Sequence, residues 1–109
     1  MKLFLDDKRD PPGEIAWSHI VVRSYEEAVE YVTQFGFPEE VWFDHDLGTE
    51  KTGLDFADFL INLDLDTGAM PVQFTFRVHS ANPAGHDNIV GLLDRYLRFR
   101  YEQHSSRTS

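Results

Sequence analysis

Acidic and imidazole side chains follow three short apolar runs of this 109-residue chain. The residues that end these runs are the pair Asp6 and Asp7, the group Asp44, His45 and Asp46, and the pair His79 and Ser80. Carboxylates are the hard oxygen ligands that Mg²⁺ and Mn²⁺ prefer, and histidine exchanges protons near neutral pH. If the fold gathers these residues, the sequence predicts a metal site with acid–base chemistry.

The elements that must position these residues alternate between strands and helices. Apolar runs predict strands over residues 2–5, 20–22, 41–43 and 71–78, and apolar residues at helical spacing predict helices after Ser24, Gly53 and Asn82, the last one running to about Tyr101. This alternation is typical of an α/β fold with a parallel sheet and right-handed crossovers. Only the first connection, of about a dozen residues, is too short for a crossover helix, and we expect a loop or one helical turn there.

The fourth predicted strand, residues 71–78, differs from the others because apolar and polar side chains alternate along it. Val72 and Phe74 lie on its apolar face. Alternation of this kind indicates a strand with one poorly covered face, hence an edge strand. In the rest of the chain we expect Trp17 in the core and His19 at the surface.

The three polar groups follow strands that end at one edge of the predicted sheet. In an open parallel sheet, ligands bind outside the carboxyl ends of the strands, where the strand order reverses. With the order 2-1-3-4, the strands 2–5 and 41–43 flank that point, and all three polar groups meet in one crevice. Ser80 and the backbone amides at 82–85 are then placed to hold a phosphate oxygen.

Each of these residues also has a purely structural interpretation. Asp6-Asp7 is typical of a turn that ends a strand, His79 alternates with polar neighbours like a surface residue, and Asn82 is a typical helix N-cap. Arg9 has nearby carboxylates with which to pair. Because the groups fall at matching strand ends, all these interpretations would have to hold together, and we favour a functional site.

Composition excludes several classes of protein. The net charge of −9 argues against duplex nucleic acid as a partner, because DNA is bound through Lys and Arg. No apolar stretch approaches the roughly 20 residues of a membrane span, so we expect no membrane association. The absence of cysteine makes a cytoplasmic location the default. We expect one domain over residues 1–103, a flexible tail over 104–109, and a monomer or weak dimer.

Three blocks of the sequence resemble the signature blocks of cyclic-phosphate processing receiver-like domains. They are LFLDDKRDPPG at 3–13, WFDHDLG at 42–48 followed by TGLDFADFL at 52–60, and VHSANPAG at 78–85. The resemblance extends from residue 3 to about residue 93. It implies a relative of the response-regulator receiver domain, with a flavodoxin-like three-layer α/β sandwich, a truncated parallel sheet of about four strands in the order 2-1-3-4, and activity on cyclic phosphates.

The resemblance also implies roles for individual residues. Asp6 and Asp7 match the acidic pair that holds a divalent cation in receivers. Asp44, His45 and Asp46 match the motif in which a receiver keeps its phosphoacceptor aspartate.

At the fourth strand, Ser80 matches a receiver hydroxyl, whereas His79 and Asn82 are additions peculiar to the family. One departure from receivers affects the mechanism: the lysine of a fifth strand has no counterpart, because no fifth strand is predicted. Lys8 or Arg9 would supply a positive charge only from another direction. This departure argues against conventional phosphotransfer.

We therefore predict a metal-dependent phosphoesterase that opens a cyclic phosphate, with Mg²⁺ or Mn²⁺ as cofactor and a small phosphorylated ligand such as a cyclic nucleotide as partner. Its predicted residues are Asp6, Asp7 and Asp46 for the metal, with Asp44 as the alternative third ligand, His45, His79 and Asp44 for catalysis, and Arg9, Ser80 and Asn82 for the phosphate.

Two other functions stay open from the sequence. One is a receiver-like signalling module that is phosphorylated on Asp44. The other is a non-catalytic module that binds a phosphorylated ligand, or that docks a protein partner through the edge strand at 72–78.

Overall fold

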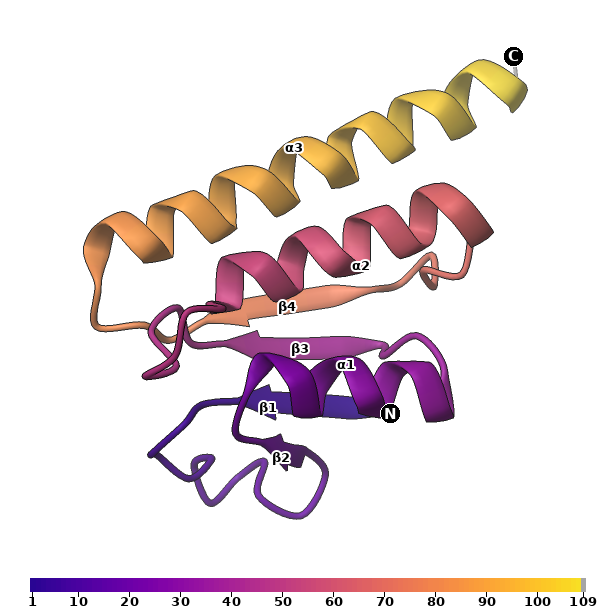
Figure 1. Cartoon of the computed structure of the whole chain (residues 1–109). Helices are drawn as coiled ribbons and strands as arrows, with labels where there is room; N and C mark the ends of the chain where they lie inside the picture. The colour runs from indigo at the N-terminus through magenta and orange to yellow at the C-terminus, as the bar shows by residue number, and fades with distance from the viewer. Residues whose placement is uncertain (109) are drawn as a thin grey trace.

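The computed structural model describes the backbone of residues 1–108 and the side chains of residues 1–103. Its strands are β1 (Lys2–Leu5), β2 (Ile20–Val22), β3 (Glu40–Phe43) and β4 (Thr75–Val78), and its helices are α1 (Tyr25–Phe35), α2 (Gly53–Thr67) and α3 (Pro83–Thr108). The strands form one parallel sheet in the order β2-β1-β3-β4 (Figure 1). The predicted α/β fold with a parallel sheet of four strands, and the strand order that the resemblance implies, are confirmed for the described residues.

The register of the sheet sets the polar strand ends at one level. Leu5, the last residue of β1, pairs with Phe43, the last residue of β3. An aspartate follows each of them, Asp6 and Asp44, and the N–H of Asp44 donates to the carbonyl of Leu5 at 3.0 Å. In the same way the N–H of His79 donates to the carbonyl of Phe43 at 2.9 Å. The parallel pairing therefore delivers all three side chains to one edge.

All three helices pack against one face of the sheet. The core on that face contains Leu3, Leu5, Val41 and Phe43 of the sheet, Ala28 and Val32 of α1, Phe56 and Leu60 of α2, and Ile89 and Leu93 of α3. Right-handed crossovers from β2 to β3 and from β3 to β4 place their helices on the same side. This arrangement leaves the opposite face of the sheet without a helix.

The connection between β1 and β2, residues 6–19, covers part of the opposite face, whereas Thr75 and Arg77 of β4 are exposed there. Residues 13–18 form turns, as the short first connection predicted. His19, expected at the surface, is buried there: its ring edge contacts Trp42, with centroids 5.8 Å apart, and its Nε2 donates to Glu40 at 2.6 Å. The sandwich thus has a loop, in place of a helix, as its third layer.

Two predictions about apolar residues were wrong. Trp17, expected in the core, is 87% exposed on the β1–β2 connection. The fourth strand begins at Thr75 rather than at Pro71. Residues 71–74 form a turn instead, in which the N–H of Phe74 donates to the carbonyl of Pro71. Val72 lies in this turn and is exposed, whereas Phe74 is buried. The edge position of β4 is confirmed.

The third helix is longer than its sequence pattern predicted, since α3 continues past Tyr101 to Thr108. The flexible tail predicted for 104–109 stays a prediction, because Ser109 and the side chains from 104 onward lie outside the described residues. No helix in the described part of the chain is both long enough and apolar enough to cross a membrane.

Candidate functional site

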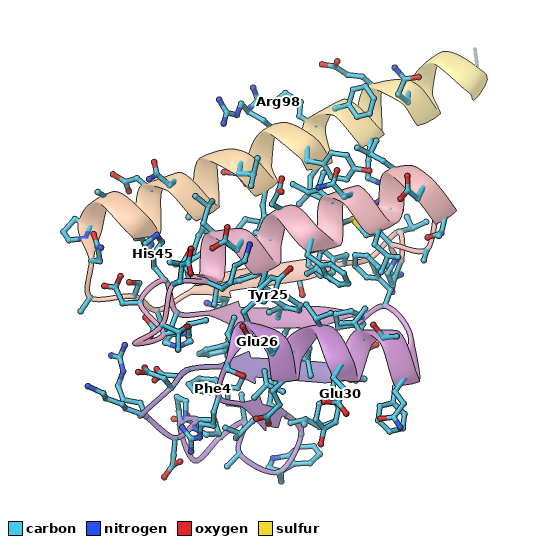
Figure 2. The ribbon with its side chains drawn as sticks, in the orientation of Figure 1. Phe4, Tyr25, Glu26, Glu30, His45 and Arg98 are labelled. Atoms are coloured by element: carbon cyan, nitrogen blue, oxygen red, sulfur yellow. The ribbon has the colours of Figure 1, made fainter. Side chains whose placement is uncertain are left out.

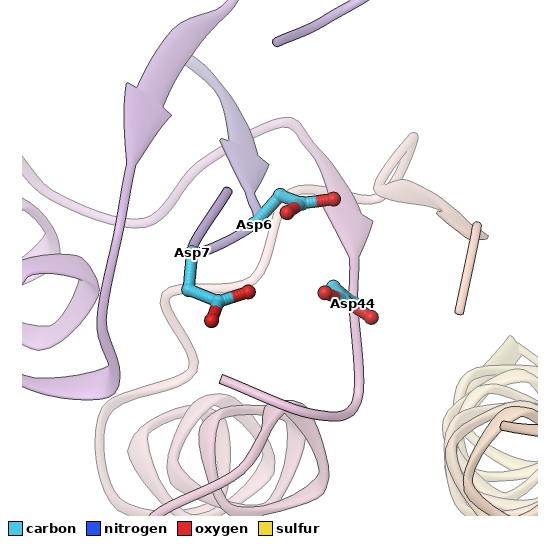
Figure 3. Close-up of side chains that lie close together, drawn as sticks. All are labelled: Asp6, Asp7 and Asp44. Carbon is cyan, nitrogen blue, oxygen red and sulfur yellow. The ribbon is translucent and has the colours of Figure 1, made fainter. Parts of the chain in front are cut away.

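Three carboxylates meet at the carboxyl edge of the sheet. Asp6 and Asp7 follow β1 and Asp44 follows β3, and each offers one oxygen within 4.8 Å of the others (Figure 3). They border a hollow of about 390 Å³, the acidic pocket, which is lined by Asp6, Asp7, Lys8, Arg9, Asp44, Asp46, Gly48 and Ala81. Hard oxygen donors from two separate strand ends are a ligand set suited to Mg²⁺ or Mn²⁺.

Asp6 is buried and already surrounded by donors. Its Oδ1 accepts the backbone N–H groups of Lys8 and Arg9 at 2.9 and 2.8 Å, and its Oδ2 accepts Arg9 Nε at 3.0 Å and His79 Nε2 at 3.1 Å. Burial raises the pKa of Asp6, but these hydrogen bonds and the charge of Arg9 outweigh it, so that the pKa lies below its ordinary value. Asp6 is therefore ionised at neutral pH.

Asp44 is buried without such partners. Among the described residues no hydrogen bond reaches its carboxylate, and the nearest cation is the guanidinium of Arg9, with Nη2 at 3.8 Å from Oδ1. Burial, and next the charge of Asp6, raise the pKa of Asp44. A buried carboxylate beside a second one is costly unless a positive charge compensates it. The donor set thus fits a divalent cation.

The loop after β3 is held against α2 and the pocket by two glycines. At Gly53 a Cβ atom would lie 1.9 Å from the carbonyl oxygen of Asp44, so that only glycine fits where α2 begins. Gly48 has a φ of +70°, and a Cβ there would lie 3.1 Å from Asp7 Oδ2. The glycines of the DLG and TGL segments are therefore required by the backbone around the carboxylates.

His79 lies beside Asp6, and two contacts hold its ring in place. The ring stacks on Phe4, with centroids 4.6 Å apart and planes 8° apart, and Nε2 donates to Asp6. Nδ1 is buried and has no partner in the described part of the chain. Burial lowers the pKa of His79 despite the nearby carboxylates. The imidazole is therefore neutral at pH 7, with its proton on Nε2.

His45 and Asp46 lie on the side of α3 rather than deep in the pocket. The ring of His45 packs on Gly85, where a Cβ atom would come within 2.3 Å of Cγ (Figure 2). Its Nδ1 donates to Asp46 at 2.9 Å, and this bond lowers the pKa of Asp46. Asp46 is exposed and also accepts from the amide of Asn82 at 3.3 Å. It lines the pocket from the rim, whereas Asp44 lines it from within.

The three predicted phosphate ligands have different surroundings. Arg9 is half-exposed and reaches both Asp6 and Asp44. Asn82 accepts the N–H of Gly85 at 3.0 Å and so caps α3, while Ser80 Oγ accepts the N–H of Asn82 at 3.1 Å. The structure therefore places Arg9 at the pocket, and gives Asn82 and Ser80 a structural task at the start of α3.

Sequence reasoning missed Arg23, which positions the loop that carries the acidic pair. Its Nη1 donates to the carbonyls of Asp6 and Arg9 at 3.2 and 2.7 Å, and its Nη2 donates to Asp10 at 2.6 Å. The sequence could have indicated this role. Arg23 directly follows β2 and therefore lies at the same edge of the sheet as the carboxylates.

Comparison with known families gives one match that covers most of the chain. The family model described as the cyclic-phosphate processing receiver domain matches residues 1–95. Comparison with curated proteins and with solved structures gives no match. The match agrees with the four-stranded receiver-like sheet and with the acidic strand ends. The chain therefore belongs to the family of cyclic-phosphate processing receiver domains.

Proposed function

We propose that this domain is a divalent-metal-dependent phosphoesterase that hydrolyses a cyclic phosphate. The observation that carries the proposal is the cluster of Asp6, Asp7 and Asp44, in which Asp44 is buried and lacks hydrogen-bond donors in the described structure. Such a carboxylate is poorly suited to stabilise a fold and well suited to hold a cation. The family to which the chain belongs processes cyclic phosphates, as its description states.

The roles of the residues follow from their positions. Asp6, Asp7 and Asp44 would hold Mg²⁺ or Mn²⁺, and the cation would supply the positive charge that polarises a phosphoryl oxygen. Asp46, the sequence-predicted third ligand, is then a group at the rim. Arg9 borders the pocket with a half-exposed guanidinium and would bind non-bridging oxygens.

Of the two predicted catalytic histidines, we favour His79 as the proton carrier. It contacts Asp6 directly, and its neutral ring carries a proton on Nε2 at physiological pH. Neither histidine lines the acidic pocket itself, but His45 is directed toward α3 and Asp46, whereas His79 is bonded to the pocket residue Asp6. We retain His45 as a group that orients Asp46.

The proposal is tested by incubating the purified protein and Mn²⁺ with a panel of 2′,3′-cyclic and 3′,5′-cyclic nucleotides. We expect conversion of at least one class to a phosphomonoester, and its loss when EDTA is added. Asp44→Asn serves as the matched inactive variant. No turnover across the panel would count against a hydrolase.

The alternative is a module that binds the phosphorylated ligand without hydrolysing it. The observation in favour of this alternative is that the two oxygens of Asp6 already accept four protein hydrogen bonds, so Asp6 would hold a catalytic cation less strongly than Asp7 and Asp44. Calorimetry distinguishes the two functions, since tight metal-dependent nucleotide binding without turnover supports sequestration. The cytoplasmic location and the monomeric or weakly dimeric state stay predictions.

A further inference from the structure

A second hollow adjoins the acidic pocket on the sheet face that has no helix. Its volume is about 160 Å³, and it is lined by Phe4, Asp6, Arg9, Asp10, Pro12, Trp42 and His79. We call it the aromatic hollow. It is smaller than the roughly 300–1,000 Å³ of a complete small-molecule site. Its size therefore suits one part of a ligand rather than a whole one.

Three flat rings form the wall of the aromatic hollow, and each is fixed in place. Phe4 and His79 are stacked, and the ring centroid of Trp42 lies 6.0 Å from that of Phe4 and 6.4 Å from that of His79. Hydrogen bonds hold two of the rings, because His79 Nε2 donates to Asp6 and Trp42 Nε1 donates to Glu40 at 3.1 Å. Fixed aromatic rings of this kind bind the face or edge of another planar ring.

The aromatic hollow and the acidic pocket share two residues. Asp6 and Arg9 line both, and Arg9 reaches from Asp6 toward Asp44 inside the acidic pocket. A ligand whose phosphate lies in the acidic pocket can therefore extend its neighbouring group past Arg9 into the aromatic hollow. The rings of the hollow offer flat surface to a planar heterocycle, and Arg9 and Asp10 in its lining offer hydrogen-bond partners to the polar edge of such a ring.

We propose that the aromatic hollow is a nucleobase subsite, so that the substrate is a cyclic nucleotide or a nucleotide end rather than a base-free cyclic phosphate. This inference rests on the proposed function of the acidic pocket for the position of the phosphate. The base lies against the ring of Trp42, and the phosphate lies at Asp44 and Arg9, with His79 between the two parts of the site.

Binding of the base is measured through Trp42 itself. The chain has two tryptophans, and the other, Trp17, is exposed on the β1–β2 connection. In Trp17→Phe protein, Trp42 is the only indole fluorophore. With Mn²⁺ present, adenosine 2′,3′-cyclic phosphate should quench it saturably, and methyl riboside 2′,3′-cyclic phosphate should not. Equal responses to the two ligands overturn the subsite.

Turnover supplies a second and independent measurement. Trp42→Leu should lower kcat/KM for the cyclic nucleotide about tenfold, as expected for loss of one stacked base, and leave kcat/KM for the methyl riboside ester unchanged. Trp42→Phe keeps a ring and should retain most of the activity, and Trp17→Leu is the control for loss of a tryptophan outside the hollow. Equal losses on both substrates in a folded Trp42→Leu protein overturn the subsite.

The two proposals fail in different ways. If neither ester is hydrolysed but the nucleotide still quenches Trp42, the hydrolase is wrong and the base subsite stands. If both esters are hydrolysed with equal kcat/KM and Trp42 does not respond, the hydrolase stands and the base subsite is wrong.

Discussion

Two buried aspartates of this domain, Asp64 and Asp44, have similar exposure and opposite surroundings. Asp64 in α2 is 7% exposed and Asp44 after β3 is 5% exposed. Asp64 accepts the N–H of Met70 at 2.9 Å and the hydroxyl of Tyr96, and pairs with Arg100 Nε at 3.1 Å. Asp44 has no hydrogen bond among the described residues and lies beside two further carboxylates.

This comparison separates a structural carboxylate from a functional one. The Asp64 cluster joins the end of α2 to α3 and satisfies its buried charge within the fold, as buried polar groups usually do. Asp44 has only the guanidinium of Arg9 at 3.8 Å as an ion-pair partner and accepts no hydrogen bond among the described residues, so its charge is only partly satisfied within the fold. The burial of a carboxylate therefore does not identify the functional site. The number of hydrogen-bond donors around the carboxylate distinguishes Asp44 from Asp64.

The largest effect is expected from breaking the satisfied cluster. Asp64→Asn removes the partner of the largely buried Arg100, and should lower the free energy of unfolding by about 3–5 kcal/mol. Urea denaturation measures this loss. Tyr96→Phe removes one bond to the same carboxylate and should cost about 1.5–3 kcal/mol. Activity of either variant, assayed well below its Tm, should match the wild type. An unchanged denaturation midpoint would contradict the assigned role.

The opposite result is expected at the other aspartate. Asp44→Asn should lower kcat/KM at least 100-fold, about 2.7 kcal/mol in the barrier, while raising the metal-free Tm. Because the pKa of Asp44 is raised, its ionised form destabilises the fold at neutral pH, and asparagine removes that effect. The gain is on the order of 1 kcal/mol. Calorimetry of the metal-free wild-type and Asp44→Asn proteins measures this change in Tm. A fall in Tm like that expected for Asp64→Asn would show that Asp44 has a structural role.

Metal addition should sharpen the comparison. Mn²⁺ at ten times its Kd should stabilise the wild-type protein by about 1.4 kcal/mol and raise its Tm accordingly. Asp7→Asn removes one ligand and should abolish the shift, whereas Glu26→Gln, an exposed acid on α1, should keep it. The same shift in Asp7→Asn would mean that Mn²⁺ binds elsewhere.

The smallest effect is expected at a third carboxylate, Glu40, which is partnered like Asp64 but less buried. It accepts hydrogen bonds from His19, Trp42 and Thr75 at 2.6, 3.1 and 3.0 Å. Burial raises its pKa, but the bond from His19 and the others outweigh it, and the pKa lies below the ordinary 4.5.

Its contribution to stability is therefore present above pH 4.5 and is lost as the pH falls through the lower folded-state pKa. Glu40→Gln should cost about 1 kcal/mol at pH 7 and should flatten the acid side of the stability curve. Thermal unfolding from pH 3 to pH 7 provides the measurement. Parallel curves for the two proteins would contradict the assignment.

Much of the site could be predicted because it depends on local patterns. Each apolar run ends at a charged or imidazole residue, and parallel strands in register bring Asp6, Asp44 and His79 to one edge. The side on which a loop residue packs could not be predicted in this way. Trp17 and His19 are two residues apart, yet the first is exposed and the second is buried.

The sequence by itself determined the alternation of strands and helices, because this alternation depends on short apolar runs and their spacing. Its motif blocks indicated the family, and the strand order that the family resemblance implies placed the carboxylates at one edge of the sheet. Only the tertiary structure decided that Asp44 rather than Asp46 lies deep in the pocket and that His45 packs on α3. Those orientations depend on the close approach of α2 and α3 to the loop, because a Cβ at Gly53 would clash with the carbonyl of Asp44 and a Cβ at Gly85 would clash with the ring of His45. These side-chain orientations are determined by contacts between segments that are distant in the sequence, and such contacts cannot be predicted from a local sequence pattern.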